Sequence, residues 1–215
     1  MNLAKARKAM VDRQIAGRGI TDAAVLEAMR KVRREDFVPP SVRELAYEDS
    51  PLPIGSGQTI SQPYIVALMI EAAALKPGDT ALEIGAGSGY AAALMGEIAA
   101  KIFTVERHAE LAQTARERLA ALGYANVEVR TGDGTLGLPD EAPFDAIISA
   151  AGGPDIPASW KSQLAIGGRL IMPVGGSAIQ QLVKLVRTAE DQFKEESLGE
   201  VRFVRLIGEQ GWKAA

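Results

Sequence analysis

The residues best placed for chemistry are the acids and glycines in the middle of the chain. The segment Leu82–Tyr90, LEIGAGSGY, has Glu83 just before glycines 85, 87 and 89. These glycines let the backbone turn tightly and let a ligand approach without a Cβ in the way. The helix that follows offers unpaired N–H groups. Because Glu83 is acidic, the turn favours a cationic ligand over a pyrophosphate, and a tight turn with no ligand is the alternative.

Two further acids follow at the ends of the next strand-like segments. Glu106 lies about 20 residues beyond the glycines, where a carboxylate can accept both ribose hydroxyls. Asp133, in the segment TGDG, can accept from an adenine amino group. The alternatives are an acid that complements a helix dipole for Glu106 and a simple β-turn for Asp133. Together the three acids match S-adenosylmethionine, which carries a sulfonium, an amino group and an adenosine.

A second polar cluster, Ser56–Tyr64 or SGQTISQPY, has no charged side chain. A hydroxyl such as that of Ser61 can orient a carboxylate without competing with it as a nucleophile. A carboxylate is ionised at neutral pH and needs no general base, so alignment and exclusion of water are sufficient for its methylation. The alternative role for Ser61 is to cap the helix that begins near Pro63.

The composition excludes several other chemistries. The 215 residues include no cysteine and one histidine, so disulfides, thiolate catalysis, cysteine-based metal sites and multi-histidine metal sites are ruled out. We expect no metal. The net charge of −3 argues against a nucleic-acid partner. Arg30–Glu35, RKVRRE, is the clearest basic cluster and is typical of a solvated helix end, with a local basic patch as the alternative.

The N-terminal region is amphipathic and charged, unlike a signal peptide, and no apolar run approaches the roughly 20 residues of a membrane span. We therefore expect a cytoplasmic monomer with no membrane partner.

Strand and helix patterns alternate from residue 65 onward. Residues 2–32 are expected to be helical with a break at GRGITD, where Thr21 or Asp22 caps the second helix. Residues 37–63 form a long, irregular connection. The expected helices are 65–75, 89–100, 108–123 and 156–164, and the expected strands are 80–85, 101–106, 126–134, 144–152, 167–175, 180–189, 192–199 and 200–208.

This pattern predicts an α/β fold: a Rossmann-like, doubly wound and mostly parallel sheet with antiparallel C-terminal strands and an N-terminal helical extension. We expect a single domain over residues 1–215. Its residues 1–60 provide N-terminal helices and a covering loop, and its residues 61–215 form the core.

The motifs together resemble the class I S-adenosylmethionine-dependent methyltransferases. Four segments, YEDSPLPIGSGQTISQPYIVALM, EIGAGSGY, GDGTLGLPDEAPFDAII and GGRLIMPVG, narrow the resemblance to the protein-L-isoaspartate O-methyltransferase family. It runs over residues 10–206, and GQTISQPY is its most specific part. The resemblance implies methylation of the free α-carboxylate of an isoaspartyl residue in an aged protein or peptide. The ester would collapse to a succinimide that reopens partly as normal aspartate.

The resemblance also implies roles for individual residues. The active-site serine of the family falls on Ser61. The positions that it implies for the cofactor are Gln58, Thr59, Ile60, Tyr64, Glu83, Gly85, Gly87, Ser88, Glu106, Arg107, Asp133 and Gly134. Ile54, Val204 and Arg205 join Ser61 at the substrate cleft. His108 is expected at the surface or at the rim of the ribose site.

One departure from the family pattern concerns substrate choice. The segment FVRL places Arg205 where the family usually has proline. A methyltransferase with another substrate and a non-catalytic cofactor-binding module therefore stay open as alternatives. An NAD-dependent dehydrogenase is disfavoured by the G-x-G-x-G spacing and by Glu83.

Overall fold

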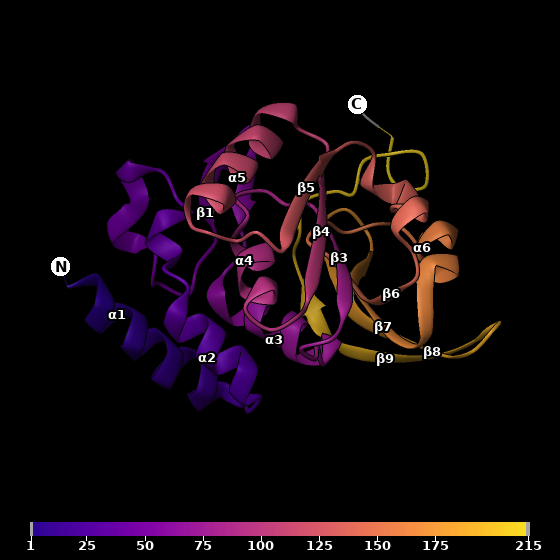
Figure 1. The fold of residues 1–215 in the computed structure, drawn as a ribbon, viewed down its shortest axis with the longest axis horizontal. Helices are drawn as coiled ribbons and strands as arrows, with labels where there is room; N and C mark the ends of the chain where they lie inside the picture. Colours follow the sequence, from indigo (N-terminus) through magenta and orange to yellow (C-terminus); the bar gives the residue numbers. More distant parts are fainter. Residues whose placement is uncertain (1, 214–215) are drawn as a thin grey trace.

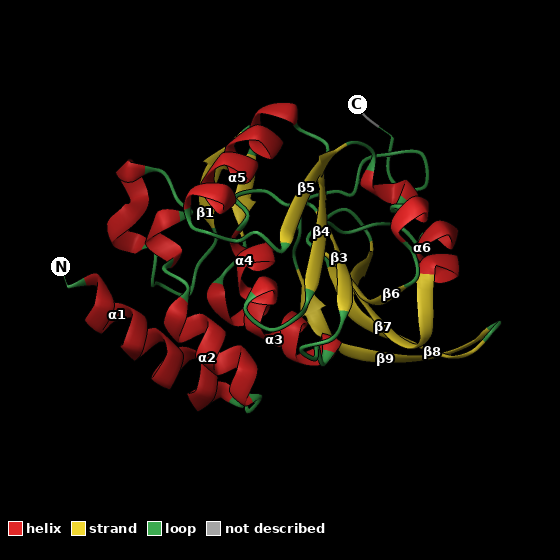
Figure 2. Cartoon of the chain, viewed as in Figure 1, coloured by secondary structure: helices red, strands yellow, loops and turns green. Residues whose placement is uncertain are grey.

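A seven-stranded sheet forms the centre of the computed structural model, which describes residues 2–213 (Figures 1 and 2). The strand order is β5-β4-β3-β6-β7-β8-β9. Pairing is parallel from β5 to β7, and β8 and β9 add as antiparallel strands. The strands are β1 Leu52–Gly55, β2 Gln58–Ile60, β3 Thr80–Ile84, β4 Lys101–Glu106, β5 Val127–Thr131, β6 Phe144–Ser149, β7 Leu164–Gly175, β8 Gln180–Ala189 and β9 Gln192–Val201.

The helices connect these strands and precede them. The α-helices are α1 Leu3–Ala9, α2 Ala23–Lys31, α3 Pro63–Ala73, α4 Tyr90–Gly96, α5 Ala109–Ala121 and α6 Ala158–Gln163. A π-helical segment, Met10–Ile15, continues α1. Short 3₁₀ helices are Ala16–Arg18, Arg34–Asp36, Pro40–Leu45, Gly134–Leu136 and Pro139–Glu141. None of the described helices is long and apolar enough to cross a membrane.

Side chains alternate between the two faces of the sheet, as the two-residue period of a strand requires. In β3, Ala81 packs into one apolar cluster and Leu82 into the other. The first cluster holds buried residues of α3, α4, α5 and the N-terminal helices. The second cluster lies on the opposite face and includes Trp160 of α6. The sheet therefore has helices on both faces, as the sequence predicted for a mostly parallel sheet.

The N-terminal helices are attached to the core through α3. Asp22 caps α2 by accepting from the N–H groups of Ala24 and Val25, which confirms one of the two predicted caps. Glu71 of α3 accepts from the N–H groups of Thr21 and Asp22, both at 2.7 Å. The Glu71 carboxylate therefore fixes the start of α2 against α3, which packs on the sheet.

The segment RKVRRE is only partly a solvated helix end. Arg30, Lys31 and Arg33 are exposed, whereas Arg34 and Glu35 are buried. The prediction is wrong for these last two residues, because the chain turns into the core in the 3₁₀ helix Arg34–Asp36 immediately after α2.

Two other local predictions differ from the structure. Residues 37–63 contain an antiparallel hairpin, β1–β2, within the expected irregular connection. The expected strand over 200–208 does not form as a unit, since β9 continues to Val201. The chain beyond it leaves the sheet and bridges to the loop after β6, where Arg205 pairs with Gly152.

Candidate functional site

Three adjoining cavities lie at the carboxyl ends of the parallel strands. They meet where β3 and β6 end, and Thr59 and Ala150 line all three. The strand order reverses between these two neighbours, which is where open α/β sheets bind ligands. We call them the open cleft, of about 470 Å³, the narrow cavity, of about 50 Å³, and the side cavity, of about 390 Å³.

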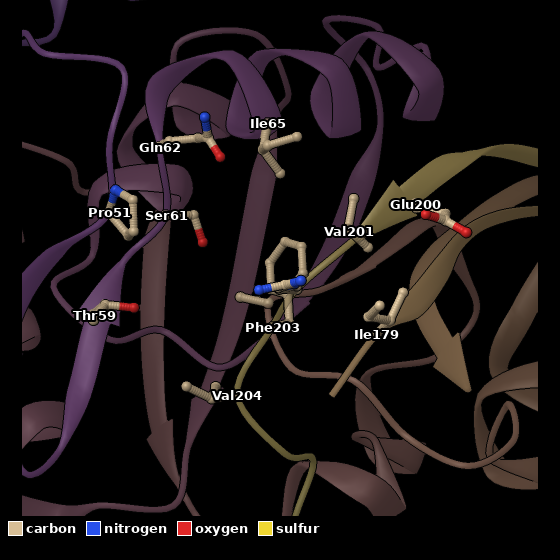
Figure 3. Close-up of a pocket in the computed structure, with 12 residues that line it drawn as sticks. Pro51, Thr59, Ser61, Gln62, Ile65, Ile179, Glu200, Val201, Phe203 and Val204 are labelled. Atoms are coloured by element: carbon tan, nitrogen blue, oxygen red, sulfur yellow. The ribbon is translucent and has the colours of Figure 1, made fainter. Parts of the chain in front are cut away.

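The open cleft is lined by segments that are far apart in the sequence (Figure 3). The Thr59 and Ser61 hydroxyls point into the cleft from one side, and Phe203 lies across from them. The lining residues are Pro51, Thr59, Ser61, Gln62, Ile65, Ala150, Ile179, Glu200, Val201, Arg202, Phe203 and Val204. Near Ser61 the cleft therefore presents neutral hydrogen-bonding groups and apolar side chains.

Ser61 also lines the narrow cavity, so its position joins the two spaces. It follows β2 and precedes Pro63, the first residue of α3. The N-cap of α3 is Gln62, whose side chain does not cap the helix, and the Asp49 carboxylate accepts from the Tyr64 N–H in the first turn at 3.2 Å. Helix capping therefore does not explain the serine. The Ser61 carbonyl accepts from the Arg34 guanidinium at 2.8 Å.

Glu83 lies in the wall of the narrow cavity and is 1% exposed. Burial raises the pKa of its carboxyl to about 8, although a hydrogen bond from the Thr104 hydroxyl opposes the shift. None of the ion pairs within residues 2–213 includes Glu83. A buried acid with no cation beside it is costly to ionise, and a cationic ligand would supply the missing charge.

The glycine-rich turn has the backbone conformation that its glycines predict. Gly85 and Gly87 have φ values of +92° and +51°. A Cβ on Gly87 would lie 3.1 Å from the Ile54 side chain, because the β1–β2 hairpin lies over the turn. The Gly87 N–H donates to Glu106 and the His108 N–H donates to the other oxygen of the same carboxylate, both at 2.9 Å. Glu106 therefore connects the turns that follow β3 and β4.

The side cavity is lined by several of the residues expected at the cofactor. Its lining includes Gln58, Thr59, Glu106, Arg107, His108 and Gly134. Each oxygen of Glu106 accepts one backbone N–H and keeps a second lone pair, so contact with ribose hydroxyls is compatible with the geometry. His108 also lines this cavity, and its place at the rim of a ribose site stays a prediction.

Two of the residues expected at the cofactor lie outside the three cavity walls. Asp133 accepts from Thr135 and from the Glu209 N–H. Burial alone would raise the pKa of this carboxyl, but the hydrogen bonds outweigh burial and the pKa is lowered. Tyr64 stacks against Arg18, whose guanidinium carbon is 3.5 Å from the ring centroid. Direct contacts of Asp133 and Tyr64 with the cofactor stay predictions. Gly134, which follows Asp133 in the sequence, does line the side cavity.

The residues expected at the substrate divide between the cavities. Val204 lines both the open cleft and the side cavity. Of the three cavities, Arg205 lines the side cavity and not the open cleft, and its contact with the substrate stays a prediction. The extended segment after β9 passes from one cavity to the other between residues 202 and 206. Ile54 lies over Gly87 instead of in a cavity wall.

The cleft also has residues that the sequence did not suggest. Ala150 follows β6 and could have been found from the rule that ligands bind beyond strand ends. Ile179, Glu200, Arg202 and Phe203 belong to β8–β9 and its flanks, which carry no motif. Within residues 2–213, no group of three or more metal-binding side chains occurs.

Comparison with known proteins gives a consistent result over almost the whole chain. Residues 5–211 match the family model for protein-L-isoaspartate(D-aspartate) O-methyltransferase. A protein-L-isoaspartate O-methyltransferase of Rhodopseudomonas palustris (strain ATCC BAA-98 / CGA009) is 60% identical over 205 residues, or 95% of this chain and 94% of the relative.

Solved structures agree. One protein-L-isoaspartate O-methyltransferase has a TM-score of 0.84 at 29% identity, over 95% of this chain and 67% of that one. A Plasmodium falciparum structure described by the same activity contains S-adenosyl-L-homocysteine. Its TM-score is 0.81 at 26% identity, over 96% of this chain and 99% of that one.

Proposed function

This chain belongs to the protein-L-isoaspartate(D-aspartate) O-methyltransferase family, and we propose how its three cavities divide that reaction between them. The enzyme transfers a methyl group from S-adenosylmethionine to the free α-carboxylate of L-isoaspartyl residues in damaged proteins or peptides. The methyl ester begins repair through a succinimide.

The narrow and side cavities fit S-adenosylmethionine. When bound, this cofactor supplies a methyl group activated by the positive charge on sulfur. Glu83 is the buried acid that a cationic ligand would complement. Gly85 and Gly87 leave the backbone open to close approach, and Glu106 and Gly134 line the adenosine side.

The observation that carries the assignment for the acceptor is that Ser61 lines both the open cleft and the narrow cavity. Its hydroxyl donates to the isoaspartyl carboxylate and orients one oxygen toward the narrow cavity. Thr59, which lines the same two spaces, assists in this alignment. No general base is needed, because the acceptor is an anion at neutral pH. Ile60 and Phe203 keep water away from the meeting point.

The wider setting follows from the same features. We propose that residues 1–215 act as one domain, since buried residues of the N-terminal helices share an apolar cluster with the sheet. We also propose a cytoplasmic monomer without nucleic-acid or membrane partners. The net charge of −3 supports the absence of a nucleic-acid partner. Elution at the size of one chain in gel filtration would support the monomer.

Methyl transfer from radiolabelled S-adenosylmethionine to a short isoaspartyl peptide tests the function, with the normal aspartyl peptide as the control. We expect label in the isoaspartyl peptide alone and its loss in mild base, because the product is an ester. Label in neither peptide, with measurable cofactor binding, would contradict the proposed acceptor while leaving the cofactor assignment intact.

A further inference from the structure

Arg34 carries a positive charge that is buried in the protein interior. Its side chain is 0% exposed. No carboxylate in the described part of the chain forms an ion pair with it. Burial lowers the pKa of its guanidinium, as expected for a cation removed from water. A buried charge without a counterion reduces stability unless hydrogen bonds compensate it, so its contacts are informative.

Those contacts connect two distant points of the chain. Nε of Arg34 donates to the Ala46 carbonyl and one terminal nitrogen donates to the Ser61 carbonyl, each at 2.8 Å. The guanidinium also lies over the ring of Tyr90, 4.9 Å from its centroid. Tyr90 begins α4 and lines the narrow cavity. One side chain therefore contacts both the backbone of the active-site serine and a wall of the cofactor space.

The residues between these two carbonyls form what we call the cover segment, residues 47–60. It contains the β1–β2 hairpin, whose Ile54 lies over Gly87 of the glycine-rich turn. It also contains Thr59, which lines all three cavities. A shift of its ends would move the hydroxyls of Thr59 and Ser61 relative to the narrow cavity.

We propose that Arg34 is a positioning residue that fixes both ends of the cover segment and thereby holds the Ser61 hydroxyl at the meeting point of the cavities. The inference rests on the role of Ser61 given under the proposed function. Arg34 touches neither reactant and acts through the Ala46 and Ser61 carbonyls.

Arginine is suited to this position for geometric reasons. Its planar guanidinium donates in several fixed directions at once, whereas a lysine ammonium is a point charge on a flexible stem. Arg34→Lys therefore keeps the charge but cannot hold both carbonyls in the same geometry. Arg34→Met removes the charge and both hydrogen bonds while keeping much of the volume.

Arg169 offers a matched control. It is 14% exposed and donates to the Ala73 and Ala74 carbonyls at 2.5 and 2.6 Å, as well as pairing with Asp79. It therefore also joins distant backbone segments, but at the amino ends of the parallel strands, away from the cavities. A merely structural loss at Arg34 should resemble that of Arg169→Met.

The experiment compares wild type, R34M, R34K and R169M well below their melting temperatures, in two ways. Steady-state kinetics on an isoaspartyl peptide give kcat and KM. Hydrogen exchange without ligands gives the protection of residues 47–60. We expect both Arg34 variants to lose at least about tenfold in kcat, since displacement of a reacting group by about 1 Å can cost far more. We expect faster exchange confined largely to the cover segment, and neither effect in R169M.

Wild-type kcat in R34K, unchanged exchange of residues 47–60, or equal losses in R34M and R169M would each overturn the inference. If R34M does not fold, R34K decides, because it keeps the charge. A wild-type enzyme that failed to methylate the peptide would instead contradict the proposed function, and the exchange measurement would still test Arg34.

Discussion

The two halves of the proposed active site are built in different ways. The cofactor half, formed by the narrow and side cavities, takes its acids from the carboxyl ends of β3 and β4, where Glu83 and Glu106 are 1% and 5% exposed. The acceptor half, the open cleft, is formed by residues near β2 and by the flanks of β8 and β9. Its rim includes Ile179 and Val204, which are 47% and 36% exposed.

This difference matches the tasks of the two halves. In the proposed function, the cofactor half would hold a cation beside a buried acid, and this interaction would be strong because water is excluded. The acceptor half would align an anion with neutral hydroxyls, whose contribution would be orientation. Changes in the cofactor half should therefore alter the affinity for S-adenosylmethionine, and changes in the acceptor half should alter kcat or KM for the peptide without changing that affinity.

The largest effect is expected for Glu83→Gln. This change keeps the shape of the side chain but removes the charge opposite the cation. We expect the affinity for S-adenosylmethionine to fall about 100-fold or more, since loss of one partner of a buried charge pair costs about 3 kcal/mol. Calorimetric titration of the protein with S-adenosylmethionine measures this affinity. Asp79→Asn, at the Arg169 pair, is the control that should lower stability without changing affinity. Equal affinities for wild type and Glu83→Gln would remove the electrostatic basis of the comparison.

Ser61→Ala should produce the next largest effect, and this effect should be on turnover instead of on cofactor affinity. We expect kcat on an isoaspartyl peptide to fall about 10- to 100-fold, because the carboxylate loses an orienting donor. The affinity for S-adenosyl-L-homocysteine should stay within about twofold of wild type, a change well under 1 kcal/mol. Ser162→Ala, on α6 and outside the three cavities, is the control. Unchanged turnover in Ser61→Ala would exclude the proposed role.

The raised pKa of Glu83 predicts a pH dependence that should be confined to the cofactor half. In the free protein this pKa is about 8, above the ordinary value of 4.5, so the folded state holds the proton more tightly than the unfolded state. The stabilisation from Glu83 is thus complete below pH 4.5 and is lost as pH rises through 8.

Binding of a cation has the opposite dependence. Because it requires the ionised carboxylate, affinity should rise by up to about tenfold per pH unit between about pH 6 and pH 7.5. Titrations in buffers with different ionisation enthalpies would detect the released proton. The slope should vanish in Glu83→Gln, and an equal slope in that variant would assign the dependence to another group.

The smallest effect is expected for Arg202→Ala at the open cleft. Arg202 is exposed, and exposed charge pairs contribute about 0–1 kcal/mol, so KM should rise about two- to fourfold. The rise should appear with peptides that carry an acid beside the isoaspartyl residue and not with basic ones. Lys194→Ala, on β9 and outside the cavities, should leave KM unchanged. A rise of tenfold or more in KM would show that peptide binding in the open cleft also depends on charge.

The sequence predicted the parallel part of the fold well, because each of its elements is specified locally. Alternating apolar strands and helices led to β3 through β7, and the glycines before Tyr90 marked the turn that the structure contains. The predicted strand over 200–208 failed for a non-local reason. Beyond Val201 the partner of the chain is Gly152, which no pattern in that segment indicates.

The same distinction explains which site residues were predictable. Glu83 and Glu106 follow from their places at strand ends, and both line cavities. The sequence did not suggest Arg202, and it could not say which cavity Arg205 lines, since the side on which each residue lies depends on the path of the chain after β9. Arg34 belongs to a charged run typical of a solvated helix end, and only tertiary packing buries it.

The bridge that Glu106 makes between the Gly87 and His108 N–H groups has a consequence for the thermodynamics of association. Two loops that must converge on one ligand are joined before it arrives. Their conformational entropy is therefore lost on folding instead of on association, and the cofactor meets a preorganised surface. Binding of S-adenosyl-L-homocysteine should then have a heat-capacity change that matches the buried area alone, without the excess that accompanies coupled folding.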